Sequence, residues 1–331
     1  MAQMYHGKDV NQKALEGKKI AVLGYGSQGR GQSLNLRDSG VNVVLGLREN
    51  GKSWSFAKME GWEPKSFAEA VKDADIIQML VPDMALADIF TQYVEPNMKP
   101  GAMLMFSHGF AITYEQIKPS STIDVTMIAP KGPGYLVRTE YEKGAGVPAL
   151  IAVHQDVSGK AKELALAYAH AIGATRGGVL ETTFKDETET DLFGEQAVLC
   201  GGAVELIKQG WETLVKAGYS AELAYFECLH ELKLIVDLLY DGGIPRMYRF
   251  VSDTAGYGAA SRGPRIIGAE SRKAMEEILK EIQNGNFAKE WTNEWNSGGK
   301  NFYAMKEQEN VHPIEKVGAD VRSHMSWLKK D

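Results

Sequence analysis

The chain has 331 residues and a formal net charge of −6, and 44% of its residues are hydrophobic while 24% are charged. This length predicts two domains with buried cores, and an acidic balance without any block of Lys or Arg argues against a nucleic-acid partner. Because the chain has only two cysteines, no signal peptide and no apolar run near the roughly 20 residues that cross a bilayer, we expect a cytoplasmic protein without a membrane partner.

The first half of the chain alternates short apolar runs with helical patterns, which is typical of a doubly wound parallel sheet. Strands are predicted at 18–23, 41–47, 75–81, 102–106, 122–128 and 149–153. Helices are predicted from the glycines at 24–29 through Asp38, and at 66–72, 85–93, 113–117 and 158–172. Ligands of such a sheet bind beyond the carboxyl ends of its strands, so we expect the functional residues in the loops that follow strands.

The first strand ends in a G-x-G-x-x-G sequence. The pattern alone is weak, but strand, glycine turn and helix in this order form a dinucleotide-binding fingerprint. Gly24 would permit the tight turn, Gly26 the approach of a pyrophosphate, and Gly29 the close packing of helix on strand. A glycine-rich turn without a ligand is the alternative. The predicted cofactor contacts in this loop are Gly24, Tyr25, Gly26, Ser27, Gln28 and Gly29.

Arg48 stands at the end of the second strand, where NAD enzymes usually carry an acidic residue for the ribose 2′-hydroxyl. Lys52, Ser53 and Ser55 follow in a predicted loop. A cation and two hydroxyls suit a 2′-phosphate, so the sequence favours NADPH over NADH and predicts Arg48, Ser53 and Ser55 as its ligands. Glu49 in the same loop is discordant and leaves room for both cofactors, and a solvated Arg48 is the alternative.

Polar residues also follow three later strands, at 82–85, 107–110 and 129–134. Asp83 would begin a helix at the edge of the cofactor, and Gly134 is a further predicted cofactor contact. His108 and Lys131 would project over the same crevice as candidate catalytic groups. A histidine in a loop is often only structural, which is the alternative for His108.

From Glu187 onward the strand pattern stops and the sequence predicts only helices. Long helices are expected at 190–217 and from a Ser220 cap to about 240, where Asp241-Gly242-Gly243 would end the second. Shorter helices are expected at 245–255, 270–282, 287–295 and 313–329. We therefore predict a dinucleotide-binding domain at 1–181 and an all-helical domain at 182–331, whose long apolar helices need a partner surface that dimerisation could supply.

Two acidic pairs lie on these helices, Asp191 with Glu195 and Glu227 with Glu231. Residues four apart share one helical face, where like charges repel. In apolar surroundings the pairs make sense if the helices face each other around hard cations such as Mg²⁺, which prefer oxygen ligands. Two solvated acidic faces are the alternative. Spacing does not say whether the pairs meet within one chain or between two.

The chain resembles ketol-acid reductoisomerases (acetohydroxyacid isomeroreductases) of the short, class I form over nearly its whole length. The matching motifs lie at 24–29, 34–40, 107–110 and 129–134, and most specifically at 181–196 and 227–233. The resemblance implies that 2-acetolactate or 2-aceto-2-hydroxybutyrate undergoes alkyl migration and then reduction by NADPH to a 2,3-dihydroxy-acid, in the synthesis of valine, leucine and isoleucine. It also implies a knotted helical domain, although true knots are very rare.

The resemblance implies a role for each of the four carboxylates. Asp191 would bridge two Mg²⁺ ions and Glu195 would bind one of them. Glu227 and Glu231 would serve the other ion from a partner subunit, with Glu231 also counted as catalytic. The minimal active unit is then a homodimer with shared active sites, possibly within a larger homo-oligomer. Two cations suit this chemistry because they stabilise a tertiary alkoxide and a ketone oxygen together. Three neighbouring acidic residues are not expected to be ligands: Asp186, Glu187 and Glu189.

The resemblance also places His108 and Lys131 at the active site and Ser252 against the substrate, whereas the residue pattern alone makes Ser252 a surface serine. Two positions depart from the family. Arg30 replaces a common His and would add positive charge near the pyrophosphate or point to solvent. Tyr135 stands where a His is common, and both changes would affect cofactor affinity.

Two other classes of protein fit part of the pattern. A metal-independent beta-hydroxyacid dehydrogenase also joins a dinucleotide domain to helices. A redox-sensing binding protein would keep the dinucleotide domain without catalysis. Neither class needs the four carboxylates together, so the metal-dependent enzyme is favoured.

Overall fold

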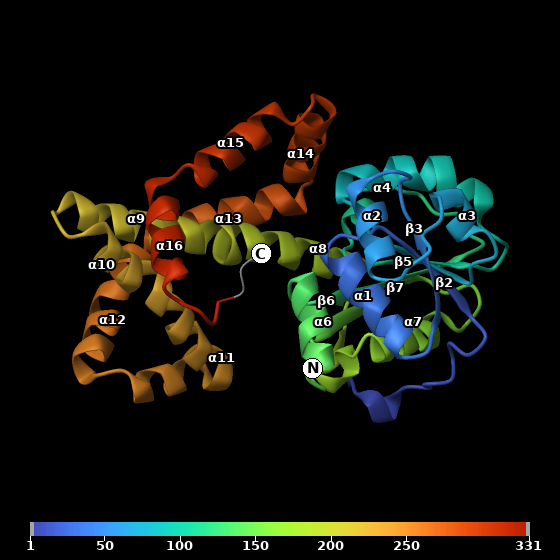
Figure 1. Cartoon of the computed structure of the whole chain (residues 1–331), viewed down its shortest axis with the longest axis horizontal. Coiled ribbons are helices and arrows are strands. Elements are labelled where there is room, and N and C mark those ends of the chain that lie inside the picture. Colours follow the sequence, from blue (N-terminus) through green and yellow to red (C-terminus); the bar gives the residue numbers. More distant parts are fainter. Residues whose placement is uncertain (1–2, 329–331) are drawn as a thin grey trace. The chain divides into compact units, whose positions relative to one another are not determined.

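The computed structural model describes residues 3–328, and the chain divides into two compact units, Met1–Thr190 and Asp191–Asp331. In Figure 1 the first unit is a sheet with helices on both faces, and the second is built from helices. The division falls within one helix. The predicted domain boundary between 181 and 182 stays a prediction.

Within the described residues, eight strands form one sheet in the order β1-β8-β7-β6-β5-β4-β2-β3. Strands β2 to β6 are mutually parallel, whereas β7 is antiparallel to β6 and β1 is antiparallel to β8. The predicted fold class is confirmed, but the sheet is mixed rather than wholly parallel. The strands are β1 Met4–Tyr5, β2 Lys19–Leu23, β3 Asn42–Gly46, β4 Ile76–Met79, β5 Met103–Phe106, β6 Asp124–Pro130, β7 Ala149–Gln155 and β8 Val179–Glu181.

The sheet has a core on each face because its central strands are largely apolar on both sides. In β2, Ile20 and Val22 belong to one core, while Ala21 and Leu23 belong to the other, and all four are fully buried. The helices of this unit are α1 Ser27–Asp38, α2 Lys52–Met59, α3 Phe67–Val71, α4 Asp83–Ile89, α5 Phe110–Thr113, α6 Gly134–Glu142 and α7 Ala161–Ala171. A π-helical turn, η2 Phe90–Val94, follows α4, and short 3-10 turns are η1 Gly7–Asp9, η3 Glu95–Asn97 and η4 Ala174–Arg176.

Two predictions in this unit were wrong. The helix expected at 113–117 is α5, which begins at Phe110 and ends early because Glu115 has a left-handed φ of 52°. The loop expected to hold Lys52, Ser53 and Ser55 is the start of helix α2. Serine and tryptophan give α2 a weak helical propensity, so its packing through the fully buried Ala57 decides the structure.

The second unit has a small core of its own, in which Trp211, Tyr225, Ile314 and Val321 are buried together. Trp211 Nε1 donates to the carbonyl oxygen of Ala221 at 3.0 Å, which satisfies the indole inside this core. The elements from the junction onward are α8 Phe184–Phe193, η5 Gly194–Leu199, α9 Gly201–Lys216, α10 Ala221–Tyr225, η6 Phe226–His230, α11 Glu231–Phe250, α12 Asp253–Ile266, α13 Ala269–Gln283, α14 Asn286–Asn296, α15 Lys300–Asn310 and α16 Pro313–Ser323.

The helices expected at 270–282 and 287–295 are confirmed as α13 and α14. The break expected at Gly242 and Gly243 is a kink with non-helical backbone inside α11. The helix expected at 190–217 begins earlier, with α8, and contains the π-helical turn η5 before α9. The helix expected from Ser220 likewise contains the π-helical turn η6. The helix expected at 245–255 is wrong, because the chain leaves α11 at Val251 and Ser252 caps α12. Helix α15 was not predicted, and α16 ends at Ser323, while residue 329 lies outside the described residues.

Candidate functional site

The glycine loop follows β2 with the geometry that its three glycines predict. Gly24 has a φ of +105°, and a Cβ atom there would lie 2.3 Å from the carbonyl oxygen of Leu80. A Cβ atom on Gly29 would lie 2.3 Å from the carbonyl oxygen of Gly24, so close packing requires glycine at both positions. Gly26 caps helix α1 and faces open space, which leaves room for a ligand at the helix N-terminus.

Helix α6 begins directly against this loop. A Cβ atom on Gly134 would lie 2.2 Å from the carbonyl carbon of Ser27, so only glycine permits the contact. The Tyr135 N–H donates to Ser27 Oγ at 3.0 Å, and Gln28 Nε2 donates to the carbonyl oxygen of Gly132 at 2.9 Å. Gly134 therefore supports the loop, and the Tyr135 contact comes from its backbone, which any residue at this position can supply.

The predicted 2′-phosphate ligands lie around the start of helix α2. Arg48 is exposed just after β3, and its carbonyl oxygen accepts the Gly51 N–H at 3.2 Å. Gly51 caps α2, whose first turn carries Ser53 and no acidic residue. The N–H groups of a helix N-terminus favour an anion, so these residues fit a phosphate. Asp83 begins helix α4 just after β4, as predicted.

His108 and Lys131, which follow β5 and β6, meet on one buried carboxylate. Glu187 Oε1 accepts from Lys131 Nζ at 2.9 Å, and Glu187 Oε2 lies 3.1 Å from His108 Nδ1. The Gly109 N–H donates to Glu187 Oε2 at 2.9 Å. The Glu187 side chain is 0% exposed, against 18% for His108 and 34% for Lys131. The carboxylate thus holds two candidate catalytic groups at the strand ends.

Helix α8 brings Glu187 to this position because Gly109 lets the helix approach. A Cβ atom on Gly109 would lie 2.3 Å from Thr188 Oγ1 and 2.7 Å from the carbonyl oxygen of Phe184. Thr188 Oγ1 also lies 2.9 Å from Thr113 Oγ1, which joins α8 to α5. The Ser-His-Gly-Phe motif therefore supplies both a histidine and the space for its carboxylate partner.

Glu187 stays ionised in spite of its burial. Burial by itself raises the pKa of Glu187, but the hydrogen bond from His108 and the charges of His108 and Lys131 outweigh it and hold this pKa below its usual value. Because the pKa of Glu187 is lower in the folded protein than in the unfolded chain, its ionisation stabilises the fold. This stabilisation is fully present at pH values above the unfolded pKa and is lost as pH falls through the folded pKa. The arrangement is therefore intact at neutral pH. Because an ionised carboxylate can only accept a hydrogen bond, His108 Nδ1 must be the donor and therefore carries a proton.

A buried polar network lies beneath these residues and was missed by sequence reasoning. Ser107 Oγ accepts from Gln78 Nε2 at 2.8 Å and from Gln32 Nε2 at 3.1 Å. Gln32 Nε2 also donates to Gln28 Oε1 at 3.0 Å, and the buried Tyr168 hydroxyl donates to Gln32 Oε1 at 2.8 Å. The network ties the glycine loop to the residue before His108. The sequence signal that could have revealed this network is the presence of polar residues inside elements that are otherwise apolar.

The predicted metal ligands lie at the ends of helices. Asp191 is one turn beyond Glu187 on helix α8, so their spacing is a property of that helix. Glu195 lies in η5, Glu227 lies in η6 and Glu231 begins α11. Each acidic pair therefore includes a residue of a π-helical turn, a feature frequent at functional sites, and the last three are exposed.

Ser252 is the N-cap of helix α12. Its Oγ accepts the Ala255 N–H at 3.2 Å, which explains a serine at this position without any ligand. The residue is exposed, and the hydroxyl proton is not used by the cap. Contact with the substrate stays a prediction.

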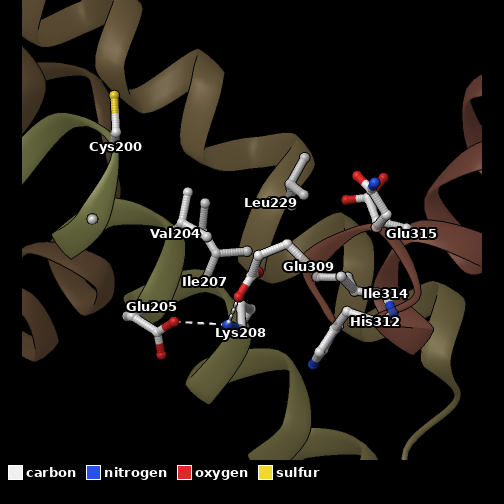
Figure 2. A pocket seen from close by; sticks show the side chains of 12 residues that line it. Cys200, Val204, Glu205, Ile207, Lys208, Leu229, Glu309, His312, Ile314 and Glu315 are labelled. Carbon is white, nitrogen blue, oxygen red and sulfur yellow. Dashed lines mark hydrogen bonds and ion pairs between the residues drawn. The ribbon is translucent and has the colours of Figure 1, made fainter. Parts of the chain in front are cut away.

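A cavity of about 590 Å³ lies within the helical unit, between α9, η6 and the segment that joins α15 to α16. Figure 2 shows Lys208 at its wall between Glu205 and Glu309, with Nζ to carboxylate distances of 2.7 and 2.9 Å. None of the predicted site residues, all of which are described, lines this cavity. It therefore adds nothing to the candidate active site.

The fold and this site define a dinucleotide-dependent oxidoreductase with a helical second domain. Two family models match most of the chain, "Acetohydroxy acid isomeroreductase, NADPH-binding domain" at residues 14–178 and "Ketol-acid reductoisomerase, C-terminal domain" at 184–327. The chain is 57% identical over 328 residues to the ketol-acid reductoisomerase (NADP(+)) of Chloroherpeton thalassium, covering 99% of this chain and 97% of that protein. The chain belongs to the ketol-acid reductoisomerase family, and the predicted family and enzyme class are confirmed.

Solved structures agree with this assignment. An NADH-preferring ketol-acid reductoisomerase from an uncultured archean superposes with a TM-score of 0.95 at 46% identity, covering 97% of this chain and 98% of that one. A semialdehyde dehydrogenase NAD-binding protein from Cupriavidus necator, at 22% identity and a TM-score of 0.61, shares the fold alone over 81% of this chain and 99% of that one. Among the described residues, no helix has the length and apolar character needed to cross a membrane.

Proposed function

We propose that this enzyme converts 2-acetolactate or 2-aceto-2-hydroxybutyrate into the 2,3-dihydroxy-acid by Mg²⁺-dependent alkyl migration and NADPH-dependent reduction, in branched-chain amino-acid synthesis. Family membership supports the overall reaction. The observation that carries the proposal is the buried Glu187 carboxylate, which holds both His108 and Lys131. The test is NADPH oxidation with 2-acetolactate as the substrate.

The residues present fit the cofactor. The glycine loop offers helix N–H groups and an open face at Gly26, and the start of α2 offers Arg48, Ser53 and Ser55. When bound, NADPH supplies the hydride for the reduction. The chain orients this cofactor through a loop held by Gly134 and by the Gln28 and Ser27 hydrogen bonds. We therefore expect a rigid pyrophosphate site next to His108.

The residues also fit Mg²⁺. Asp191 and Glu195 would hold it with the partner subunit's Glu227 and Glu231, and bound ions supply positive charge at the substrate oxygens. Glu187 already accepts from three donors, which supports a role in positioning rather than as a ligand. His108 and Lys131 then face the reacting oxygens, where His108 can hold or return a proton and Lys131 can stabilise negative charge.

A homodimer with shared active sites is part of the proposal. The helical unit exposes large apolar side chains, with Tyr240 88% exposed, Tyr257 72% and Leu199 69%. Glu227 and Glu231 lie beside such residues, since Phe226 and Leu234 are exposed too. Large apolar side chains exposed in this number support an interaction face on the helical unit. A knotted helical domain, a larger assembly and a cytoplasmic location likewise stay predictions.

The triple variant Arg48→Ala, Ser53→Ala, Ser55→Ala is expected to raise the Kd of NADPH by about 100-fold and that of NADH by less than about threefold, because only NADPH carries the 2′-phosphate. Fluorescence titration of each cofactor measures both values. Lys58→Ala, at the other end of α2, is the control and should change neither. Equal losses for the two cofactors would remove the phosphate assignment.

A further inference from the structure

Glu60, the residue that ends helix α2, binds two residues of the glycine-loop segment. Arg30 Nη2 lies 2.6 Å from Glu60 Oε1, and Arg30 Nε lies 3.0 Å from both carboxylate oxygens. The Tyr25 hydroxyl donates to Glu60 Oε2 at 2.7 Å. Tyr25 belongs to the glycine loop and Arg30 to helix α1, so one carboxylate joins the far end of α2 to both.

Aromatic side chains complete this Glu60 cluster. Trp62 Nε1 donates to the Tyr25 hydroxyl at 2.9 Å, and the Phe56 ring centroid lies 6.1 Å from that of Tyr25. The guanidinium carbon of Arg37, from α1, lies 4.6 Å from the centroid of the Trp62 ring, and Arg37 Nη1 donates to the carbonyl oxygen of Glu60 at 3.1 Å. Tyr25 is only 4% exposed as a result. The cluster consists of Tyr25, Arg30, Arg37, Phe56, Glu60 and Trp62.

The cluster explains what Arg30 does in place of the common His. Neither expectation for Arg30 included a partner, and its guanidinium forms a bidentate pair with Glu60. The hydrogen bond from Arg30 keeps the pKa of Glu60 below its usual value, so the pair is fully charged at neutral pH. The positive charge of Arg30 is thereby offset within the pair.

Helix α2 connects this cluster to the predicted phosphate site. Its first turn carries Ser53, its N-cap Gly51 donates to the carbonyl oxygen of Arg48, and its eight residues form a rod of about 12 Å. A short rod held at one end has its other end placed by that attachment. We propose that Glu60 is a positioning residue for the 2′-phosphate pocket, fixing the start of α2 relative to the glycine loop. This inference rests on the proposed NADPH dependence of the enzyme.

The test compares cofactor binding in Glu60→Ala with that in the parent enzyme, by fluorescence titration without substrate. Misplacing one hydrogen bond to a charged phosphate weakens binding by about tenfold, so the Kd of NADPH should rise by about that factor. The Kd of NADH should rise by less than about twofold, and kcat at saturating NADPH should stay within about twofold, while KM for NADPH follows its Kd. Glu60→Gln retains the packing and should shift the same constants in the same direction.

A matched control exists at the opposite edge of the sheet. Glu181 on β8 also binds a tyrosine and a cation. The Tyr5 hydroxyl donates to Glu181 Oε2 at 2.6 Å, and Lys162 Nζ lies 2.8 Å from both carboxylate oxygens. Glu181→Ala removes a similar set of hydrogen bonds far from α2. It should lower stability to urea by a similar amount and leave the Kd of both cofactors unchanged. A general loss of stability would act alike in the two variants.

Three outcomes overturn the inference: an unchanged Kd of NADPH, equal losses for NADPH and NADH, or the same shift in Glu181→Ala. The result for the Arg48, Ser53 and Ser55 triple variant separates the two proposals. If the triple variant raises the Kd of NADPH more than that of NADH while Glu60→Ala does not, only the positioning role of Glu60 is rejected. If neither variant discriminates, the phosphate pocket falls and the role of Glu60 falls with it.

Discussion

Replacing Glu187 by Gln is expected to lower kcat by about 100-fold or more while the chain still folds. Gln has the same shape and can still accept the Gly109 N–H, but it loses the charge that holds His108 and Lys131. Both groups would then be misplaced and their protonation changed, and catalysis depends steeply on such preorganisation. Losing hydrogen bonds to charged partners should also lower the free energy of unfolding by about 1–3 kcal/mol.

Steady-state kinetics with 2-acetolactate and urea unfolding measure the two effects of Glu187→Gln. Glu189→Gln is the matched control, because it makes the same change on the same helix at a buried position whose ion-pair partner is Lys185 at 3.9 Å. We expect this control to keep kcat within about twofold. A Glu187→Gln enzyme with the parent kcat would show that the carboxylate has no part in positioning the catalytic groups.

Asp191→Asn and Glu227→Gln are each expected to lower kcat by about 1,000-fold and to raise the Mg²⁺ concentration needed for activity, because each removes a carboxylate charge from the proposed metal site. Binding of NADPH without Mg²⁺ should be unchanged, since the glycine loop lies in the other unit of the chain. Glu222→Gln, an exposed acidic residue in the first turn of α10, is the control and should retain activity.

The same two variants test whether subunits share active sites. In a heterodimer of Asp191→Asn with Glu227→Gln, one site would carry both changes and the other site neither. Random pairing of co-expressed chains should therefore restore about a quarter of the parent activity. If each chain supplied all four carboxylates of its own site, every site would carry one change and the mixture would stay inactive.

Elements with a regular apolar period were predictable, and short or polar elements were not. The run Ile20 to Leu23 is apolar at every position, as a strand buried on both faces must be. Helix α2 lacks such a pattern and forms because Ala57 packs into the core. The antiparallel direction of β7 depends on how the chain returns to the sheet, which no local pattern encodes.

The site was predictable where chemistry follows from a motif. The packing roles predicted for Gly24 and Gly29 agree with the structure, because a Cβ atom at either position would clash with a backbone carbonyl oxygen. The sequence predicted no role for Glu187, which was not expected to be a metal ligand. Sequence spacing cannot show that helix α8 brings this residue to His108. The partner of Arg30 was equally invisible, because Glu60 is thirty residues away and meets it only through the packing of α1 and α2.

We propose that this chain is a Mg²⁺-dependent enzyme acting on an acetohydroxyacid. The most direct measurement is the oxidation of NADPH with 2-acetolactate after thorough chelation, and again after Mg²⁺ is restored. We predict no turnover in the chelated enzyme and full recovery with added Mg²⁺, because bound Mg²⁺ would supply the positive charge that the proposed alkyl migration needs at the substrate oxygens. Turnover that survives chelation would contradict this account and favour a metal-independent dehydrogenase.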